Sequence, residues 1–211
     1  MEITYWADFT CPYSYIGSQN LMMALKNMEI TADVFMKSYE LNPNMPKDKS
    51  ESSQQQLKEI DGLNPQQIKE QIENLNAYAA LSKLPMDFAK ARFCNTFDAH
   101  RLTCWAQKVD LAKSNTLISL IFNANFAKGE DIADHKILLQ LAHEAGLNET
   151  EAKAVLDSDD YGNEVRAQER EADAIPVETI PYFIIDGVVV DHSDTLQGFE
   201  EILAQILKAK N

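Results

Sequence analysis

Apolar positions near the N-terminus follow first a strand pattern and then a helical one. Segment 2–6 is short and rich in apolar residues, and 31–38 alternates apolar with polar residues; both patterns predict β-strands. Between them, apolar residues of 12–28 recur on one helical face, which predicts an amphipathic helix. The Pro/Asn-rich segment 42–46 is typical of a turn.

The middle of the chain, from about residue 50 to 175, predicts one helix after another. Asn64 and Asn148 are expected to cap helix starts, because one precedes a proline and the other stands three residues before a glutamate. Gly129 and Gly146 are typical helix stops. The expected helices are 53–60, 65–82, 97–112, 115–127, 134–145, 149–156 and 159–173.

The C-terminal part returns to strands. Segment 182–185 is an apolar run, the Asp186-Gly187 pair is a strong hairpin-turn signal, and 188–190 reads as the returning strand. A final amphipathic helix is expected over 195–209.

These elements predict an α/β domain interrupted by helices. The length of 211 residues accommodates one domain that carries an insertion. We expect an α/β domain made of 1–45 and 174–211, and an all-helical insertion domain over 46–173. No internal repeat accompanies this pattern.

Composition narrows the class of protein. Apolar residues make up 45% of the chain, enough for a sizeable core, and the formal charge is −14. This charge argues against nucleic acid or an anionic membrane as a partner. The sequence shows no signal-peptide pattern and no apolar stretch of about 20 residues. A cytoplasmic location is therefore expected.

Cysteine and histidine usage excludes two kinds of site. Cys11, Cys94 and Cys104 are odd in number and widely spaced, which is not a disulfide framework. The four histidines do not combine with them into zinc-ligand spacing, so no metal site is expected.

The strongest chemical signal is Cys11, which stands where a strand meets a helix. Pro12 suits the first helical position, and a helix N-terminus favours a thiolate over a thiol. These features predict a nucleophilic cysteine with a pKa well below the ordinary value. The alternative is that Cys11 has no chemical role and simply packs as a small apolar side chain in the core. Three residues later, where a dithiol enzyme has its second cysteine, the chain has Ser14.

Pro181 opens the C-terminal apolar strand. It either simply begins that strand, or the Ile180–Pro181 peptide bond is cis. In the second case we expect the N–H and C=O of Ile180 to be free to pair with an extended substrate peptide. A cysteine at a helix start together with such a proline is the combination used by thioredoxin-like enzymes.

Three segments carry a family resemblance. Segment 11–17, Cys-Pro-Tyr-Ser-Tyr-Ile-Gly, resembles the Cys-Pro-Trp-Cys-Tyr-Ile-Gly site of the FrnE-like branch of the DsbA family. Segment 95–102 resembles that branch's Asn-Ser-(aromatic)-Asp-Ala-His-Arg stretch, and 180–187 resembles its Val-Pro-(aromatic)-Phe element. The resemblance runs essentially end to end. It implies a thioredoxin-like fold with a helical insertion and a thiol–disulfide oxidoreductase or isomerase activity.

The resemblance also implies roles for individual residues. Cys11 corresponds to the nucleophile, and because Ser14 replaces the resolving cysteine, monothiol chemistry through a mixed disulfide is expected. The Ser14 hydroxyl is expected to donate a hydrogen bond to the thiolate. The substrate-binding residues implied are Pro12, Tyr13, Ile180 and Pro181.

The cosubstrate and partners follow from the same site. Cys-Pro-Tyr-Ser also resembles the site of single-cysteine glutaredoxin variants, which act through glutathione. We therefore expect no tightly bound cofactor, with glutathione or another low-molecular-weight thiol as cosubstrate. The expected partner is a thiol- or disulfide-containing protein or small molecule, and a homodimer is left open.

An alternative function rests on the Ser193-Asp194 pair. It is similar to the loop with which kappa-class glutathione transferases and the related 2-hydroxychromene-2-carboxylate isomerases bind the γ-glutamyl end of glutathione. The pair can equally cap the last helix. Those relatives usually have a serine where this chain has Cys11, which counts against a transferase or isomerase. A third reading is an adaptor or chaperone-like protein that has lost the chemistry.

Other polar residues leave alternatives open. Cys94 is either a remote resolving thiol for Cys11 or a buried bystander. Asp8 either accepts a proton from Cys11 or is simply buried in the turn. Asp98, His100 and Arg101 fall within one helical turn and are expected to form a structural pair or cap, with a catalytic His100 as the alternative.

Overall fold

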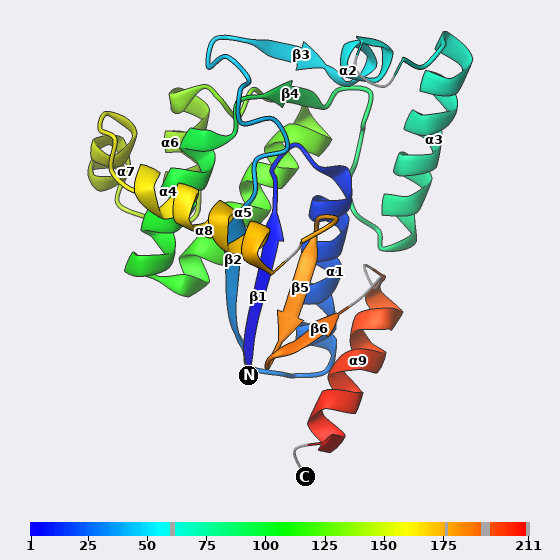
Figure 1. Ribbon diagram of the computed structural model, residues 1–211, viewed down its shortest axis with the longest axis vertical. Helices are drawn as coiled ribbons and strands as arrows, with labels where there is room; N and C mark the ends of the chain where they lie inside the picture. The colour runs from blue at the N-terminus through cyan, green and yellow to red at the C-terminus, as the bar shows by residue number, and fades with distance from the viewer. Residues whose placement is uncertain (60–61, 176, 191–194, 210–211) are drawn as a thin grey trace.

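The two ends of the chain meet in a four-stranded sheet, and the middle of the chain forms the helices around it (Figure 1). The computed structural model describes residues 1–59, 62–175, 177–190 and 195–209. The sheet has the order β2-β1-β5-β6, in which β1 and β2 are parallel and the other pairs antiparallel. Its strands are β1 (Glu2–Ala7), β2 (Asp33–Ser38), β5 (Tyr182–Ile185) and β6 (Val188–Val190).

Side-chain alternation fixes the two faces of this sheet. Tyr5 lies opposite Phe183 and stacks on it, and Phe183 packs edge-on against Phe199 of α9 (Leu196–Ala209). The neighbouring Trp6 points to the other face, where its Nε1 donates to the Gln168 carbonyl at 3.0 Å. Each face is therefore covered by helices.

The helices on the two faces come from different parts of the chain. α1 (Pro12–Asn27) packs with α9 on one face, while α8 (Gly162–Ala174) lies against the other (Figure 1). α1 approaches the start of β5 closely at Gly17, where an added Cβ would lie 3.0 Å from Pro181 Cγ. The 186–187 turn has left-handed backbone at both residues, which confirms the predicted hairpin.

The middle of the chain is helical, as predicted, with two boundaries that differ. The expected helix 97–112 breaks at Asp110, whose extended backbone and side chain cap the next helix by accepting from Lys113 N–H. The expected helix 159–173 begins only at 162, because Tyr161 has left-handed backbone. The other helices are α2 (Ser53–Glu59), α3 (Pro65–Leu81), α4 (Phe97–Val109), α5 (Leu111–Asn123), α6 (His135–Glu144) and α7 (Glu149–Leu156).

Two small features were not expected. β3 (Ser50–Ser52) pairs with β4 (Arg92–Cys94) in a separate two-stranded sheet, and three residues are too few for an alternation to show. α5 continues into a π-helical turn, η1 (Ala124–Lys128), which ends at Gly129 with φ 71°. A Cβ there would lie 2.7 Å from the Lys90 carbonyl oxygen, so this stop requires glycine.

The predicted fold class, a thioredoxin-like α/β fold with a helical insertion, is confirmed by this topology, but the segment 46–173 is not all-helical because it contains β3 and β4. One hydrophobic cluster runs through the sheet and the inserted helices. The division into separate domains at 45/46 and 173/174 stays a prediction. None of the helices in the described part of the chain combines the length and apolar character needed to cross a bilayer.

Candidate active site

Cys11 is the N-cap residue of α1. Its backbone is extended (φ −88°, ψ 115°), and its Sγ accepts a hydrogen bond from the Ser14 backbone N–H at 3.4 Å. Pro12 follows at the first helical position, as predicted. The sulfur therefore takes the place that a serine or aspartate oxygen has in an ordinary helix cap.

The start of β5 faces this sulfur. The Ile180–Pro181 peptide bond is cis, as predicted. The Cys11 thiol donates toward the Ile180 carbonyl oxygen at 3.7 Å. The prediction that the N–H and C=O of Ile180 pair with a substrate stays a prediction; in the resting protein this carbonyl also faces the Cys11 thiol.

Burial dominates the acidity of the nucleophile. Cys11 is 5% exposed, and burial raises its pKa to about 11, although the polar groups of the Ser14 side chain, the Ser14 N–H and the Tyr13 N–H act to lower it. The negative charge of Asp8 adds to the increase. The prediction of a pKa well below the ordinary value is wrong, because the loss of water around the thiolate outweighs the helix N-terminus.

The other residues of segment 11–17 differ in access. Ser14 is fully buried, and its hydroxyl oxygen has no hydrogen-bond partner among the residues that the structure describes, so the predicted hydrogen bond from this hydroxyl to Cys11 is not formed in the resting thiol. Tyr13 is 43% exposed, and its ring lies 6.4 Å from that of Tyr78 on α3. Pro12 and Pro181 are partly exposed. A ligand that approaches Cys11 therefore meets Tyr13 and the two prolines first.

The remaining cysteines lie apart from this cap. All three cysteines are free thiols. Cys94 sits on β4, and its pKa is raised by burial and by the Asp131 carboxylate. Cys104 on α4 lies near Ser38 and Gln168, and burial raises its pKa to about 11. Ser193 and Asp194 lie outside the described residues.

Sequence reasoning missed Asn125, which fastens the loop before Cys11. It is fully buried on η1. Its Nδ2 donates to the Phe9 carbonyl at 3.1 Å, and its Oδ1 accepts from the Arg92 N–H at 2.8 Å. The π-helical turn aims this amide at both partners, and a single asparagine in a helical stretch gives no sequence signal of that.

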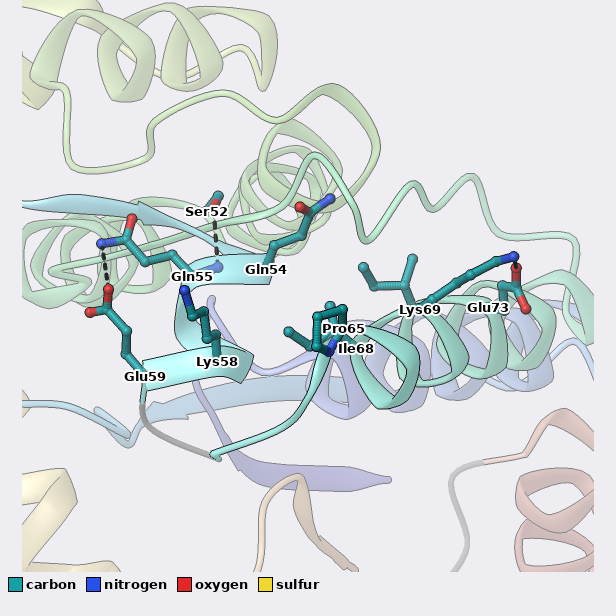
Figure 2. A pocket seen from close by; sticks show the side chains of 10 residues that line it. Ser52, Gln54, Gln55, Lys58, Glu59, Pro65, Ile68, Lys69 and Glu73 are labelled. Atoms are coloured by element: carbon teal, nitrogen blue, oxygen red, sulfur yellow. Dashed lines mark hydrogen bonds and ion pairs between the residues drawn. The ribbon is translucent and has the colours of Figure 1, made fainter.

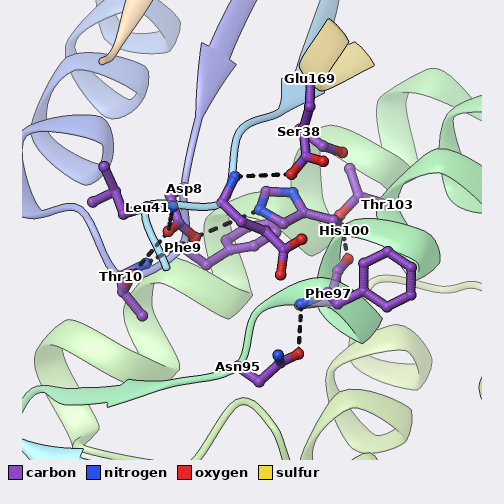
Figure 3. A network of polar contacts seen from close by, with 12 residues as sticks. Asp8, Phe9, Thr10, Ser38, Leu41, Asn95, Phe97, His100, Thr103 and Glu169 are labelled. Atoms are coloured by element: carbon purple, nitrogen blue, oxygen red, sulfur yellow. Dashed lines mark hydrogen bonds and ion pairs between the residues drawn. The ribbon is translucent and has the colours of Figure 1, made fainter. Parts of the chain in front are cut away.

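Asp8 organises the same loop from inside (Figure 3). Its carboxylate accepts from the Leu41 N–H at 2.8 Å and from the Thr10 hydroxyl at 3.0 Å, and it lies 3.5 Å from His100 Nε2. Burial alone would raise the pKa of Asp8, but His100 and the hydrogen bonds outweigh it and hold the pKa below the ordinary value. The Cys11 N–H donates to the Asp8 carbonyl at 3.1 Å.

The expected structural pair on α4 is present. Arg101 Nη1 donates to Asp98 at 2.8 Å, and the same guanidinium donates to the carbonyl oxygens of Val155, Ser158 and Asp160. Arg101 therefore fastens the segment between α7 and α8. His100 points the other way, toward Asp8.

Two cavities bear on where a ligand binds. A pocket of about 630 Å³ lies between α2 and α3, lined by Lys58, Lys69 and carboxylates, and it contains no residue of segment 11–17 (Figure 2). A smaller cavity of about 330 Å³ lies between α1, α3 and α9; it also contains no residue of segment 11–17, but it includes Tyr78, the ring partner of Tyr13. Within the described ranges, no three His, Cys, Asp or Glu side chains are grouped to hold a metal ion.

Solved structures share the fold of this chain. One is described as a probable DsbA oxidoreductase from Streptomyces coelicolor; it is 29% identical, with a TM-score of 0.88 over 99% of this chain and 90% of the other. A 2-hydroxychromene-2-carboxylate isomerase is 14% identical, with a TM-score of 0.72 over 100% and 98%.

A third structure, the cytosolic disulfide reductase DsbM from Pseudomonas aeruginosa, is 19% identical, with a TM-score of 0.65 over 99% and 100% of the two chains. No curated protein matches the chain. The family model of the DSBA-like thioredoxin domain matches residues 2–204. With Cys11 at the start of α1 and Pro181 facing it, the chain belongs to the DsbA-like thioredoxin domain family, whose activity class is thiol–disulfide oxidoreductase or isomerase.

Proposed function

We propose that this protein exchanges thiols and disulfides with a single cysteine. The observation that carries the proposal is the cap of α1, where Cys11 Sγ is positioned by Ser14 and Ile180. A serine at the position of the second cysteine leaves no neighbour on α1 that can close a disulfide with Cys11.

The reaction needs two exchange steps. The Cys11 thiolate attacks one sulfur of a substrate disulfide, an S–S bond forms to Cys11, and the other sulfur leaves as a thiolate that takes up a proton. A second thiolate then attacks the mixed disulfide and releases Cys11. The electrons balance within these thiols and disulfides, so reduction or isomerisation of the substrate follows from which thiol attacks second.

Ser14 and the residues around Cys11 support the first step. The Ser14 N–H and hydroxyl favour the negatively charged sulfur and therefore oppose the effect of burial. Pro12, Tyr13, Ile180 and Pro181 surround the approach to Cys11, and we propose that they hold the substrate. A substrate that displaces the Cys11 thiol from the Ile180 carbonyl frees that acceptor for its own backbone N–H.

We propose glutathione or another low-molecular-weight thiol as the second thiol. Cytosolic DsbM, which shares the fold, has a structure described as holding GSH. The cavity between α1, α3 and α9 offers room for a small ligand beside Tyr78, whose ring neighbours that of Tyr13. A cytoplasmic location, with its reduced thiols, suits this cycle.

A turnover assay tests the proposal. The reduction of a mixed disulfide between glutathione and a cysteine peptide is followed with glutathione in excess. We expect turnover by the wild-type protein and none by Cys11→Ser. Ser14→Cys is the matched variant, and we expect it to form an internal disulfide and to oxidise dithiol peptides. Equal rates for wild type and Cys11→Ser would contradict the proposal.

A glutathione-dependent transferase or isomerase is the second candidate, supported by the Ser193-Asp194 pair. It predicts that reduced glutathione binds, that Asp194→Ala abolishes binding, and that the protein turns over an electrophile. Absence of binding at millimolar glutathione would remove it. An adaptor without chemistry would instead keep all of its activity in cells after Cys11→Ala.

A further inference from the structure

Three buried ionisable side chains from three elements meet behind the loop that carries Cys11. Asp8 follows β1 and His100 lies on α4 (Figure 3). Glu40 follows β2. Asp8 and His100 are each 1% exposed, and the Glu40 side chain is 0% exposed. Buried ionisable groups are costly unless they are paired, so their meeting needs a physical account.

His100 contacts the carboxylate of Asp8. Its Nε2 lies 3.5 Å from Asp8 Oδ1, and neither ring nitrogen makes a shorter hydrogen bond within the described ranges. Its ring packs 5.0 Å from that of Phe9, directly beside Asp8 in the chain. The imidazole is therefore held for its contact with the Asp8 carboxylate rather than for a dense hydrogen-bond network.

Glu40 is a second carboxylate that interacts electrostatically with His100. One Glu40 oxygen accepts from Arg166 of α8, which also binds Glu169, whereas Oε1 has no hydrogen-bond partner among the described residues. Burial raises the pKa of Glu40, and the charges of His100 and Arg166 oppose that increase. His100 thus interacts with two carboxylates, those of Asp8 and Glu40. Arg166, which is partly exposed, binds the Glu40 carboxylate.

The other charged groups of α4 are already occupied. Asp98 is bound by Arg101, Lys47 and His135. The charges that face His100 from the elements packed against it are therefore those of Asp8, Glu40, Arg166 and Glu169.

We propose that the Asp8–His100 pair, together with Glu40, sets the charge beside Cys11 and so controls how readily the thiol reacts. The proposal rests on the proposed role of Cys11 as the nucleophile. The Asp8 carboxylate repels the Cys11 thiolate, and the His100 ring, 3.5 Å from Asp8, offsets part of that charge. Asp8 and His100 act as positioning residues, because neither binds the sulfur.

The two partners predict effects of opposite sign on alkylation of Cys11. Asp8→Asn removes a negative charge, and we expect about a three- to tenfold faster reaction with iodoacetamide at a fixed pH near 8. His100→Gln leaves Asp8 unbalanced, and we expect a slowing of about the same factor. His135→Gln removes an exposed histidine that pairs with Asp98 on the other side of α4 and should change the rate less than about twofold.

Peptide mass spectrometry reads the rate at Cys11 separately from Cys94 and Cys104. A loosened site would expose Cys11 in both variants and speed both, so rates that move in the same direction, or that both stay within about twofold of wild type, would overturn the proposal. Alkylation needs no disulfide substrate. The alkylation rates can therefore contradict the role of the Asp8–His100 pair even if Cys11 exchanges disulfides. Conversely, they can support that role even if Cys11 does not.

A second measurement avoids substitution at the buried pair. Wild-type protein is alkylated at Cys11 with iodoacetate, which adds a negative charge, or with iodoacetamide, which adds a neutral group of similar size. We expect the ¹⁵N signals of the His100 ring to differ between the two adducts at one pH, while those of His135 agree. Identical His100 signals would contradict a charge connection between His100 and Cys11.

Discussion

Cys11 and Cys94 are equally buried thiols in different electrostatic surroundings. Each is 5% exposed, and the negative charge of Asp8 raises the pKa of both. Donors surround Cys11, namely the Ser14 N–H and hydroxyl and the Tyr13 N–H. Cys94 instead faces a carboxylate, that of Asp131. A thiolate is thus supported at one site and opposed at the other.

This difference shows what distinguishes a nucleophile from a core cysteine in this fold. Burial is common to both, so burial does not decide the role. The end of a helix supplies hydrogen-bond donors without adding charge, and these lower the cost of the thiolate at Cys11.

The pH dependence of alkylation should separate the two thiols most clearly. Because burial raises the pKa of Cys11 to about 11, its thiolate fraction rises with pH, and we expect the rate to increase about 100-fold from pH 7 to about 9 without a plateau. Cys94 in the native protein should react at least about 100-fold more slowly than in urea. Iodoacetamide labelling with peptide mass spectrometry measures both. A plateau for Cys11 below about pH 8 would restore the low pKa predicted from the sequence.

Removing the Ser14 hydroxyl should lower the reactivity of Cys11 and leave that of Cys94 unchanged. Ser14→Ala deletes a hydroxyl that supports the thiolate, and we expect alkylation of Cys11 to slow about tenfold at a fixed pH. Ser18→Ala is the matched control, because Ser18 is a buried serine of the same helix that donates to the Tyr15 carbonyl instead. An equal effect of the two variants would assign the loss to helix packing.

A side chain added where α1 meets β5 should destabilise the fold beside the Cys11 site. The Cβ of Gly17→Ala would lie 3.0 Å from Pro181 and 3.3 Å from Phe183, so one of them must shift. We expect a loss of about 1 kcal/mol in the free energy of unfolding, roughly fivefold in the folding equilibrium, measured by urea denaturation. Lys26→Ala near the end of the same helix should change it little, and a neutral Gly17→Ala would show that the contact yields freely.

The smallest expected effect lies on the Cys94 side. Asp131→Asn removes the carboxylate charge beside Cys94, and we expect labelling of Cys94 to speed about two- to threefold. The rate at Cys11 should stay unchanged, because Asp131 does not contribute to its pKa. Labelling both thiols in one sample makes Cys11 the internal control. A change in the labelling rate of Cys11 alone would show that Asp131 acts on Cys11 and not on Cys94.

The sequence predicted the long elements of the fold and failed on short ones. Periodic segments and strong turn signals gave the sheet, the hairpin and the order of helices. β3 and β4 have three residues each, and they pair only because the helices between them return the chain. The cap at Asp110 was visible as an aspartate, yet the apolar pattern on both sides concealed the break.

The candidate site divides in the same way. Cys11 at the helix start, Pro12 after it and the cis bond before Pro181 were predictable, because each follows from neighbours in the chain. The raised pKa of Cys11 was not, since it depends on burial by distant segments. Asn125 and Glu40 also reach this region only through tertiary packing.

Intact mass after reaction with oxidised glutathione tests the central claim most directly. Reduced wild type, Cys11→Ser and Cys94→Ser are each incubated with oxidised glutathione at about pH 8, where thiolate exchange proceeds. We predict one glutathionyl adduct on wild type and Cys94→Ser and none on Cys11→Ser. A loss of two hydrogens that requires both Cys11 and Cys94, or an unreactive Cys11, would contradict a single-cysteine mechanism.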